Sequence, residues 1–320
     1  MKHLTTVLLA LLPASALADD PTIDQAAEVG APVTVGNLTI FPLTPKTPAT
    51  DDTDVVTLDE AFDQKLLSIK ETDESGSVNT LHVSNKGKTA VYAMVGEVLL
   101  GGKQDRIVGR NVLIPPGARE MEVAVFCVEH GRWTQETAQF GSAKTLAHTT
   151  LRQQANKGSQ GAVWAEVAKT NEKLQSKTAT DTYRAAVKKV AAAGDVEKAV
   201  KELERQTAAV GGMAGIIVAV NGELRALDWF ASPKLYRKLE HKLVSSYVSD
   251  ALGEADGQVH PAPQSAAAKQ FVANASKVRV KSEEASGAGR VYDFDSKDIE
   301  GQMLKPAAGK RAIHETYYIK

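Results

Sequence analysis

The chain has 320 residues, an apolar fraction of 43% and a formal net charge of −1, from 38 basic and 39 acidic side chains. With this balance the protein has no excess of positive charge to attract nucleic acid or anionic lipid, so neither is an expected partner. Cys127 is the single cysteine of the sequence, which excludes an intramolecular disulfide, so stability has to come from packing.

The first eighteen residues have the three parts of a secretion signal. Lys2 and His3 form a basic start, residues 4–12 an apolar run too short to cross a bilayer, and residues 16–18 (Ala-Leu-Ala) a cleavage site before Asp19. We therefore predict that residues 1–18 are a signal peptide and that the mature chain is exported, to the periplasm or the medium. No later stretch approaches the roughly 20 apolar residues of a spanning helix, so we expect no stable membrane insertion after cleavage.

Composition and periodicity divide the rest of the chain into a short tail and one domain. Residues 19–32 are polar, which predicts a flexible N-terminal segment. Residues 33–320 are predicted to form a single α+β domain, because strands return after the helices. Its parts are a β-rich stretch at 33–140, a helix-rich stretch at 145–275 and closing strands at 278–320.

The β-rich stretch predicts an antiparallel, sandwich-like half. Thr57 and Glu60 form a capping box at the start of a short helix. Apolar residues then recur with a period of two between turns rich in Asn, Gly and Pro. Two hairpins are predicted, one joining 78–83 to 90–100 and the other joining 111–114 to 121–128.

The helix-rich stretch encloses a predicted central hairpin. Residues 216–220 are apolar on both faces and are followed by Asn221-Gly222, a strong hairpin signal, so we expect a buried strand that turns back through 224–229. Ser232-Pro233 then predicts a helix start, since serine caps and proline suits the first helical position. The helix carries an apolar residue at every fourth position: Leu235, Leu239, Leu243 and Tyr247.

The densest polar segment is GEVLLGGKQDR at residues 96–106. Gly101 and Gly102 could free backbone N–H groups for an anion, with Lys103 and Arg106 supplying charge. Glu97 is an acid inside an apolar strand, which costs free energy unless it is paired. The alternative interpretation is that Glu97 pairs with Arg106 and the loop is a solvated turn. The predicted ligand-binding residues here are Gly101, Gly102, Lys103, Gln104, Asp105 and Arg106.

A second polar segment, FCVEHGRW, follows at residues 126–133. Glu129, His130 and Arg132 place an acid, a base and a bidentate cation within four residues, and Trp133 offers a stacking face. One interpretation gives Glu129 and His130 a functional role. The alternative is that both are solvated residues at a strand end. Cys127 alternates with apolar positions, which favours a buried structural thiol over a nucleophile.

No metal site is predicted. The histidines after the signal are scattered and form no HxH or HExxH pattern. They are His82, His130, His148, His241, His260 and His314. The sequence identifies no cofactor and no protein partner.

The two polar segments, together with the Val220-Asn221-Gly222 turn leading to Phe230 and Ser232-Pro233, resemble a domain family named for its association with ADP-ribosylglycohydrolases and rhodanese-phosphatases. The resemblance covers roughly residues 33–252. The family is essentially uncharacterised, and its name records genomic company with enzymes of ADP-ribose and NAD metabolism. The residues that match its motif positions are Glu97, Lys103, Gln104, Arg106, Glu129, Arg132 and Trp133.

Three hypotheses follow for function. The first is a binding protein for a small anionic ligand, such as a nucleotide- or ADP-ribose-like molecule, held by the two polar segments. The second is a hydrolase in which Glu129 or His130 is the general base and Glu97 orients it; Glu97, Glu129 and His130 are then the catalytic residues. The third is a structural or partner-binding envelope protein in which these residues form a buried salt-bridge network.

Overall fold

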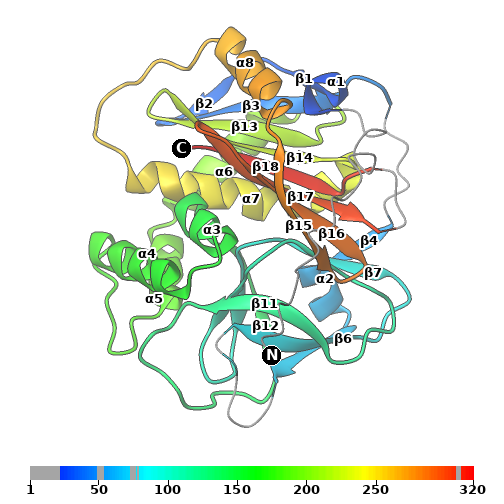
Figure 1. The fold of residues 1–320 in the computed structure, drawn as a ribbon. Coiled ribbons are helices and arrows are strands. Elements are labelled where there is room, and N and C mark those ends of the chain that lie inside the picture. The colour runs from blue at the N-terminus through cyan, green and yellow to red at the C-terminus, as the bar shows by residue number, and fades with distance from the viewer. Residues whose placement is uncertain (1–21, 49–53, 73–76, 78, 308–310) are drawn as a thin grey trace, which may run out of the picture.

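The computed structural model describes residues 22–48, 54–72, 77, 79–307 and 311–320. The predicted signal peptide at 1–18 lies outside the described residues. Runs of strands and runs of helices follow one another along the chain, and the strand pairs are antiparallel apart from β4 with β7 (Figure 1). The predicted α+β class is confirmed.

A nine-stranded antiparallel sheet forms the upper half of the molecule in Figure 1. Its order is β1-β3-β13-β14-β18-β17-β16-β15, and β2 also pairs with β3. The strands are β1 (Ala27–Val29), β2 (Val33–Val35), β3 (Leu38–Pro45), β13 (Gly215–Val220), β14 (Glu223–Phe230), β15 (Val280–Ser286), β16 (Gly289–Asp295), β17 (Ile299–Pro306) and β18 (His314–Ile319). The sheet thus combines N-terminal, central and C-terminal segments.

The hairpin β13–β14 lies at the centre of this sheet, as predicted. Asn221 and Gly222 form its turn with φ angles of 51° and 79°, the left-handed conformation that this pair adopts easily. Every residue of β13 is buried. Local turn chemistry and an apolar run therefore defined the central strand correctly.

Helices cover both faces of the large sheet. Helix α7 (Pro233–Gly253) and helix α6 (Asp195–Thr207) pack on one face, and α8 (Ser265–Ala275) and α1 (Ile23–Ala26) pack on the other (Figure 1). The hydroxyl of Ser232 accepts a hydrogen bond from the N–H of Leu235, which confirms the predicted cap of α7. Among the described residues, no helix is both long and apolar enough to cross a bilayer.

Two smaller sheets form the lower half, in the orders β10-β7-β4 and β12-β8-β9-β11-β6-β5. They enclose an apolar core that includes Ile69, Val91 and Val123, as in a sandwich. Their elements are β4 (Val55–Thr57), α2 (Leu58–Asp63), β5 (Leu67–Glu71), β6 (Thr80–Asn85), β7 (Ala90–Ala93), β8 (Glu97–Leu100), β9 (Arg106–Val108), β10 (Val112–Ile114), β11 (Met121–Cys127) and β12 (Gly141–Leu146). The capping box of Thr57 and Glu60 starts α2 as predicted.

The two hairpins predicted in this half are wrong. Strand β6 pairs with β5 and β11, whereas β7 pairs with β4 and β10, so the turn at 85–87 and the turn at 115–117 each carry the chain from one sheet to the other. The predicted strand at 90–100 is also two strands, because the backbone turns at Gly96. Turn residues indicate a reversal but not the sheet that the chain enters next.

Three helices pack on the outer face of the six-stranded sheet. These are α3 (Thr149–Asn156), α4 (Gln160–Lys173) and α5 (Tyr183–Ala193), which appear in green in Figure 1. Leu151, Val167 and Ala186 from these helices meet Val98 and Ile107 of the sheet. The group also touches α6 and α7, so helices from both halves lie side by side.

The described part of the N-terminal segment, residues 22–32, contains helix α1 and strand β1. Ile23 of α1 and Ala27 of β1 are buried, and β1 adds to the edge of the large sheet. Their apolar contacts include Phe271 of α8. The composition of the segment is polar because only a few of its side chains face the core. These side chains contact α8, which lies about 245 residues later in the chain.

Candidate functional site

Three glycines of the first polar segment let side chains pass close to the backbone. Gly96, Gly101 and Gly102 have φ angles of +89°, +126° and +53°. A Cβ atom at Gly96 would lie 2.4 Å from Cγ of Arg152, and one at Gly102 would lie 2.2 Å from Cζ of Phe140. Because real Cβ atoms do not approach this closely, close packing as well as backbone conformation requires glycine here.

The backbone N–H groups expected to hold an anion, those of Gly101 and Gly102, are bonded within the protein. Gly101 N donates to Asp105 Oδ1 at 3.0 Å, and Gly102 N donates to Thr137 Oγ1 at 3.3 Å. A ligand at this loop would have to compete with both. Binding at this loop stays a prediction.

Glu97 is buried against helix α7 and pairs with Lys242. Its other oxygen accepts a hydrogen bond from Met94 N at 2.7 Å. Lys242 also donates to Asp59 Oδ2 at 2.8 Å, so one lysine joins β8 and α2 to α7. Burial raises the pKa of Glu97, an effect that Lys242 partly offsets.

Arg106 has other partners than the Glu97 of the alternative interpretation. Its guanidinium donates to the carbonyl of Gln104 at 2.7 Å and lies 3.6 Å from Glu71 Oε1. The side chain is fully buried. Glu97 and Arg106 are therefore each paired, but with different residues.

The two polar segments do come together, in a network of acids and arginines. Arg132 donates through Nε to Glu129 Oε2 at 2.8 Å, and its Nη2 lies 3.4 Å from Asp105 Oδ1. Arg184 of α5 donates to both oxygens of Asp105, at 2.7 and 2.5 Å, and to Glu136. Burial raises the pKa of Glu129, but bonds from Arg132 and other donors lower it more, so the net shift is downward.

His130 and Trp133 lie at the surface beside this network. The His130 ring meets Trp164 edge to face at 4.5 Å between centroids, and the His130 carbonyl accepts from Gln104 Nε2 at 3.3 Å. Trp133 is 46% exposed, and the Lys103 ammonium lies 5.4 Å from the centre of its ring. Neither residue contacts Glu97 in the part of the chain that the structure describes.

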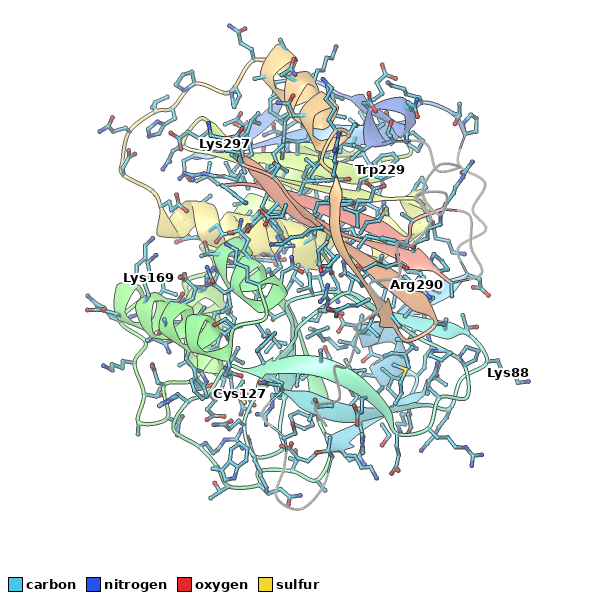
Figure 2. All side chains as sticks on the ribbon, viewed as in Figure 1. Lys88, Cys127, Lys169, Trp229, Arg290 and Lys297 are labelled. Atoms are coloured by element: carbon cyan, nitrogen blue, oxygen red, sulfur yellow. The ribbon has the colours of Figure 1, made fainter. Side chains whose placement is uncertain are left out.

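Cys127 is the buried thiol that the sequence predicts. It lies at the end of β11, beneath the helices α4 and α5 (Figure 2). Burial raises the pKa of its thiol to about 11, which keeps it protonated at neutral pH. A protonated thiol is a poor nucleophile.

A cavity of about 510 Å³ lies between α4, α5, α6 and α7, with β12 at one side. None of the eleven predicted site residues lines it. Its apolar wall includes Leu146, Leu174, Ala186, Val187, Val190 and Val196. The volume is that of typical small-molecule sites, which measure roughly 300–1,000 Å³.

One end of the cavity carries a polar cluster around His148, the N-cap residue of α3. Its Nε2 lies 3.0 Å from Thr170 Oγ1 and 4.0 Å from Glu166 Oε1. Its Nδ1 lies 3.5 Å from Asp250 Oδ1, and the hydroxyl of Tyr183 accepts from its backbone N–H at 3.2 Å. All five residues line the cavity.

Four lysines line the same cavity, and three of them have carboxylate neighbours. Lys144 pairs with Asp63, Lys242 with Glu97 and Asp59, and Lys169 with Glu166 at 3.9 Å. Lys169 lies on the outer side of α4 (Figure 2). Lys173, one turn after it, has no ion-pair partner among the described residues and is the cation most available to a ligand.

A second polar cluster is buried between the large sheet and α7. Asp228 Oδ1 lies 2.9 Å from His314 Nε2, Oδ2 accepts from the hydroxyl of Tyr247, and the Arg152 guanidinium lies 3.8 Å away. His314 Nδ1 lies 2.9 Å from the hydroxyl of Tyr92. These side chains are almost completely buried, so the cluster links sheet, helices and lower half as an internal network.

No pattern in the sequence predicts the His148 cluster or the role of Arg184. The histidine, hydroxyl and acidic residues of the cluster lie between positions 148 and 250, with no spacing that marks a motif. Within the described residues, no group of three or more His, Cys, Asp and Glu side chains is arranged to hold a metal ion. Only the folded arrangement of α3, α4 and α7 reveals this end of the cavity.

Comparison with protein families gives one match. A sequence model of the ARPP-1 domain, the ARG and Rhodanese-Phosphatase-superfamily-associated Protein domain, matches residues 26–318, and the chain belongs to this family. The match confirms the resemblance and extends it through the C-terminal strands. The searches of curated proteins and of solved structures found no match.

Proposed function

We propose that this ARPP-1 family member binds a small organic acid with an apolar body in the cavity between α4, α5, α6 and α7. The observation that carries the proposal is the cavity itself, whose 510 Å³ combine an apolar wall with one polar end at His148. Sites for small molecules typically have such a composition, since apolar walls supply binding free energy and a few polar groups fix orientation.

The charges around the cavity favour an acidic ligand. Each of the four acids in the lining has a basic neighbour: Glu197 has Lys201 at 3.0 Å, Glu254 has Arg225 at 3.3 Å, Glu166 has Lys169 at 3.9 Å, and Asp250 has His148 at 3.5 Å. Lys173 is the lining cation without an ion-pair partner among the described residues. Its ammonium can therefore pair with a carboxylate or phosphate group of the ligand.

In this proposal the two polar segments hold the cavity wall in place from outside the cavity. Lys242 lines the cavity on α7, and its pairing with Glu97 fixes α7 against β8. Arg184 lies in the first turn of α5 and ties that helix to Asp105. The segments thus stabilise the positions of two helices of the cavity wall. The proposed binding does not require them to contact the ligand.

Binding can be tested by thermal unfolding with octanoate, octyl phosphate and octanol as probes. A ligand at 100 times its dissociation constant adds about 2.7 kcal/mol to stability, which gives a measurable rise in Tm. We expect the two acids to stabilise the protein more than octanol does. The substitution Val187→Trp, which fills the cavity, should abolish all three effects.

The charge assignment has a matched control. Lys173→Met should weaken octanoate binding about tenfold and leave octanol unchanged, whereas Lys177→Met, at an exposed site outside the lining, should change neither. Equal effects of the two lysine substitutions would show that net charge alone is responsible. Binding that survives Val187→Trp would place the ligand outside this cavity.

We further propose that the protein acts after export, on the basis of the predicted signal at residues 1–18. Its ligand would then be a molecule available outside the cytoplasm. N-terminal sequencing of the protein recovered from a secreting host should give Asp19 as the first residue. An intact N-terminus in a cytoplasmic fraction would contradict export.

A further inference from the structure

Three side chains form a continuous chain of contacts at the polar end of the cavity. Asp250 comes from the end of α7, His148 precedes α3, and Thr170 lies in the last turn of α4. Asp250 Oδ1 lies 3.5 Å from His148 Nδ1, and His148 Nε2 lies 3.0 Å from Thr170 Oγ1. The order is carboxylate, imidazole, hydroxyl, which is the arrangement that activates a hydroxyl for nucleophilic attack.

Hydrogen bonds hold the Asp250 carboxylate in place. The second oxygen of Asp250 accepts from the backbone N–H of Thr149 at 2.9 Å and from the Thr149 hydroxyl. Burial raises the pKa of Asp250, but bonds from His148 and Thr149 lower it more, so the net shift is downward. The free oxygen therefore faces the imidazole in its ionised form.

Two groups face His148 Nδ1, and their strengths decide the tautomer. Leu151 N–H points at Nδ1 from 3.5 Å as a neutral cap bond, and the Asp250 carboxylate lies at the same distance. A bond from Nδ1–H to an ionised carboxylate is about twice as strong as a neutral one. When Nδ1 carries the proton, its bond to Asp250 replaces the Leu151 cap bond, and Nε2 is free to accept the Thr170 hydroxyl proton.

Thr170 differs from three other hydroxyl residues in the helices of this protein. The hydroxyls of Thr207, Ser245 and Ser249 donate to the carbonyl four residues earlier, the usual bond of a hydroxyl within a helix. The Thr170 hydroxyl bonds to His148 instead, and it lines the cavity. Lys173 lies one turn further on and lines the same cavity.

We propose that the cavity is the active site of an esterase for small acyl esters, with Thr170 as nucleophile and His148 as general base. Asp250 is a positioning residue that orients His148, and the Lys173 ammonium stabilises the negative charge on the substrate oxygen. This inference rests on the proposed function, because the acyl group occupies the apolar part of the cavity.

The reaction balances without a cofactor. His148 Nε2 takes the Thr170 proton as Oγ1 bonds to the ester carbonyl carbon, and the resulting intermediate expels the alcohol, which receives that proton from His148. Water then gives a proton to His148 and attacks the acyl carbon. The bond to Thr170 breaks, Oγ1 recovers the proton, and the carboxylic acid leaves.

The test uses the full chain with a fluorophosphonate probe, peptide mass spectrometry and hydrolysis of p-nitrophenyl octanoate. We expect an adduct on Thr170 and turnover. Thr170→Val should remove the adduct and lower the rate at least 100-fold, while Thr170→Ser should retain both. Thr207→Val, a change of the same size on helix α6 but outside the cavity lining, should leave both unchanged.

His148→Asn should slow adduct formation by about 10²–10⁴-fold. Asp250→Asn should lower kcat with little change in KM and alter the pH profile, which a merely structural role would not do. An adduct that forms equally in Thr170→Val would overturn the inference. Octanoate stabilisation without adduct or turnover would overturn the esterase and leave the binding function standing, whereas loss of both would remove both proposals.

Discussion

Gly96 lies directly against the side chain of Arg152, and a Cβ atom at Gly96 would be 2.4 Å from the arginine's Cγ. Gly96 begins the first polar segment, and Arg152 is fully buried between Tyr247 and Tyr318, with its guanidinium carbon 4.9 and 5.9 Å from their ring centres. The motif glycine therefore makes room for a buried cation of the second polar cluster.

This contact predicts a large effect of Gly96→Ala. The methyl group would displace Arg152 and would also occupy a backbone conformation with φ of +89°. We expect a loss of about 3 kcal/mol in the free energy of unfolding, measured by urea denaturation. Gly117→Ala, with φ of +71° and open space around it, should lose only about 1 kcal/mol. Equal losses would show that backbone strain alone is responsible.

The network between the two polar segments should be cooperative. Asp105→Asn leaves two arginines facing a neutral amide, and we expect a loss of about 2–3 kcal/mol in the free energy of unfolding. Arg184→Met should lose less, because Arg184 is partly exposed and solvent screens its charge. A double-mutant cycle should give a coupling of at least about 1 kcal/mol between the two positions. Additive losses would contradict the network.

His314 should make stability depend on pH. Burial lowers the pKa of His314 more than Asp228 raises it, so the folded pKa lies below the ordinary value near 6.5. The unfolded state then binds the proton more readily, and stability is complete above about pH 6.5 and falls as the pH drops toward the folded pKa. Chemical denaturation between pH 7 and 5 should show this slope.

His314→Gln should flatten that slope, although it will also lower stability at pH 7. His82→Gln, a change on β6 away from the cluster, should leave the slope intact. If the slope is the same in all three proteins, groups other than His314 set the pH dependence.

Cys127 should be unreactive in the folded protein. Its burial and a thiol pKa of about 11 both oppose thiolate formation at pH 8. We expect 5,5′-dithiobis(2-nitrobenzoic acid) to react with less than about a tenth of the thiol in native protein and with all of it in guanidinium chloride. Rapid reaction without denaturant would mean that the thiol is accessible.

Local patterns in the sequence predicted elements well and pairings poorly. The Asn221-Gly222 turn and the Ser232-Pro233 helix start are specified by residues that are neighbours in the chain, so both are confirmed. The pairing of β6 with β11 depends on which sheet the chain enters after each turn. No residue near the turn at 85–87 specifies that choice.

The candidate site shows the same limit. Glu129 and Arg132 lie together because only two residues separate them at a strand end. The sequence did not indicate that Glu97 would pair with Lys242, which lies 145 positions away. The acid, imidazole and hydroxyl of the His148 cluster are similarly dispersed, so the topology rather than any motif brings them to one cavity.

The most direct test of the central claim is to locate the ligand by photo-crosslinking. An octanoate analogue that carries a diazirine at its apolar end would be irradiated with the full chain, and the labelled peptides identified by mass spectrometry. We predict labels on the cavity walls, in 183–196 of α5 and α6 and in 241–254 of α7, with competition by free octanoate. Labels confined to 101–106 and 129–133 would contradict the cavity and place the site at the two polar segments.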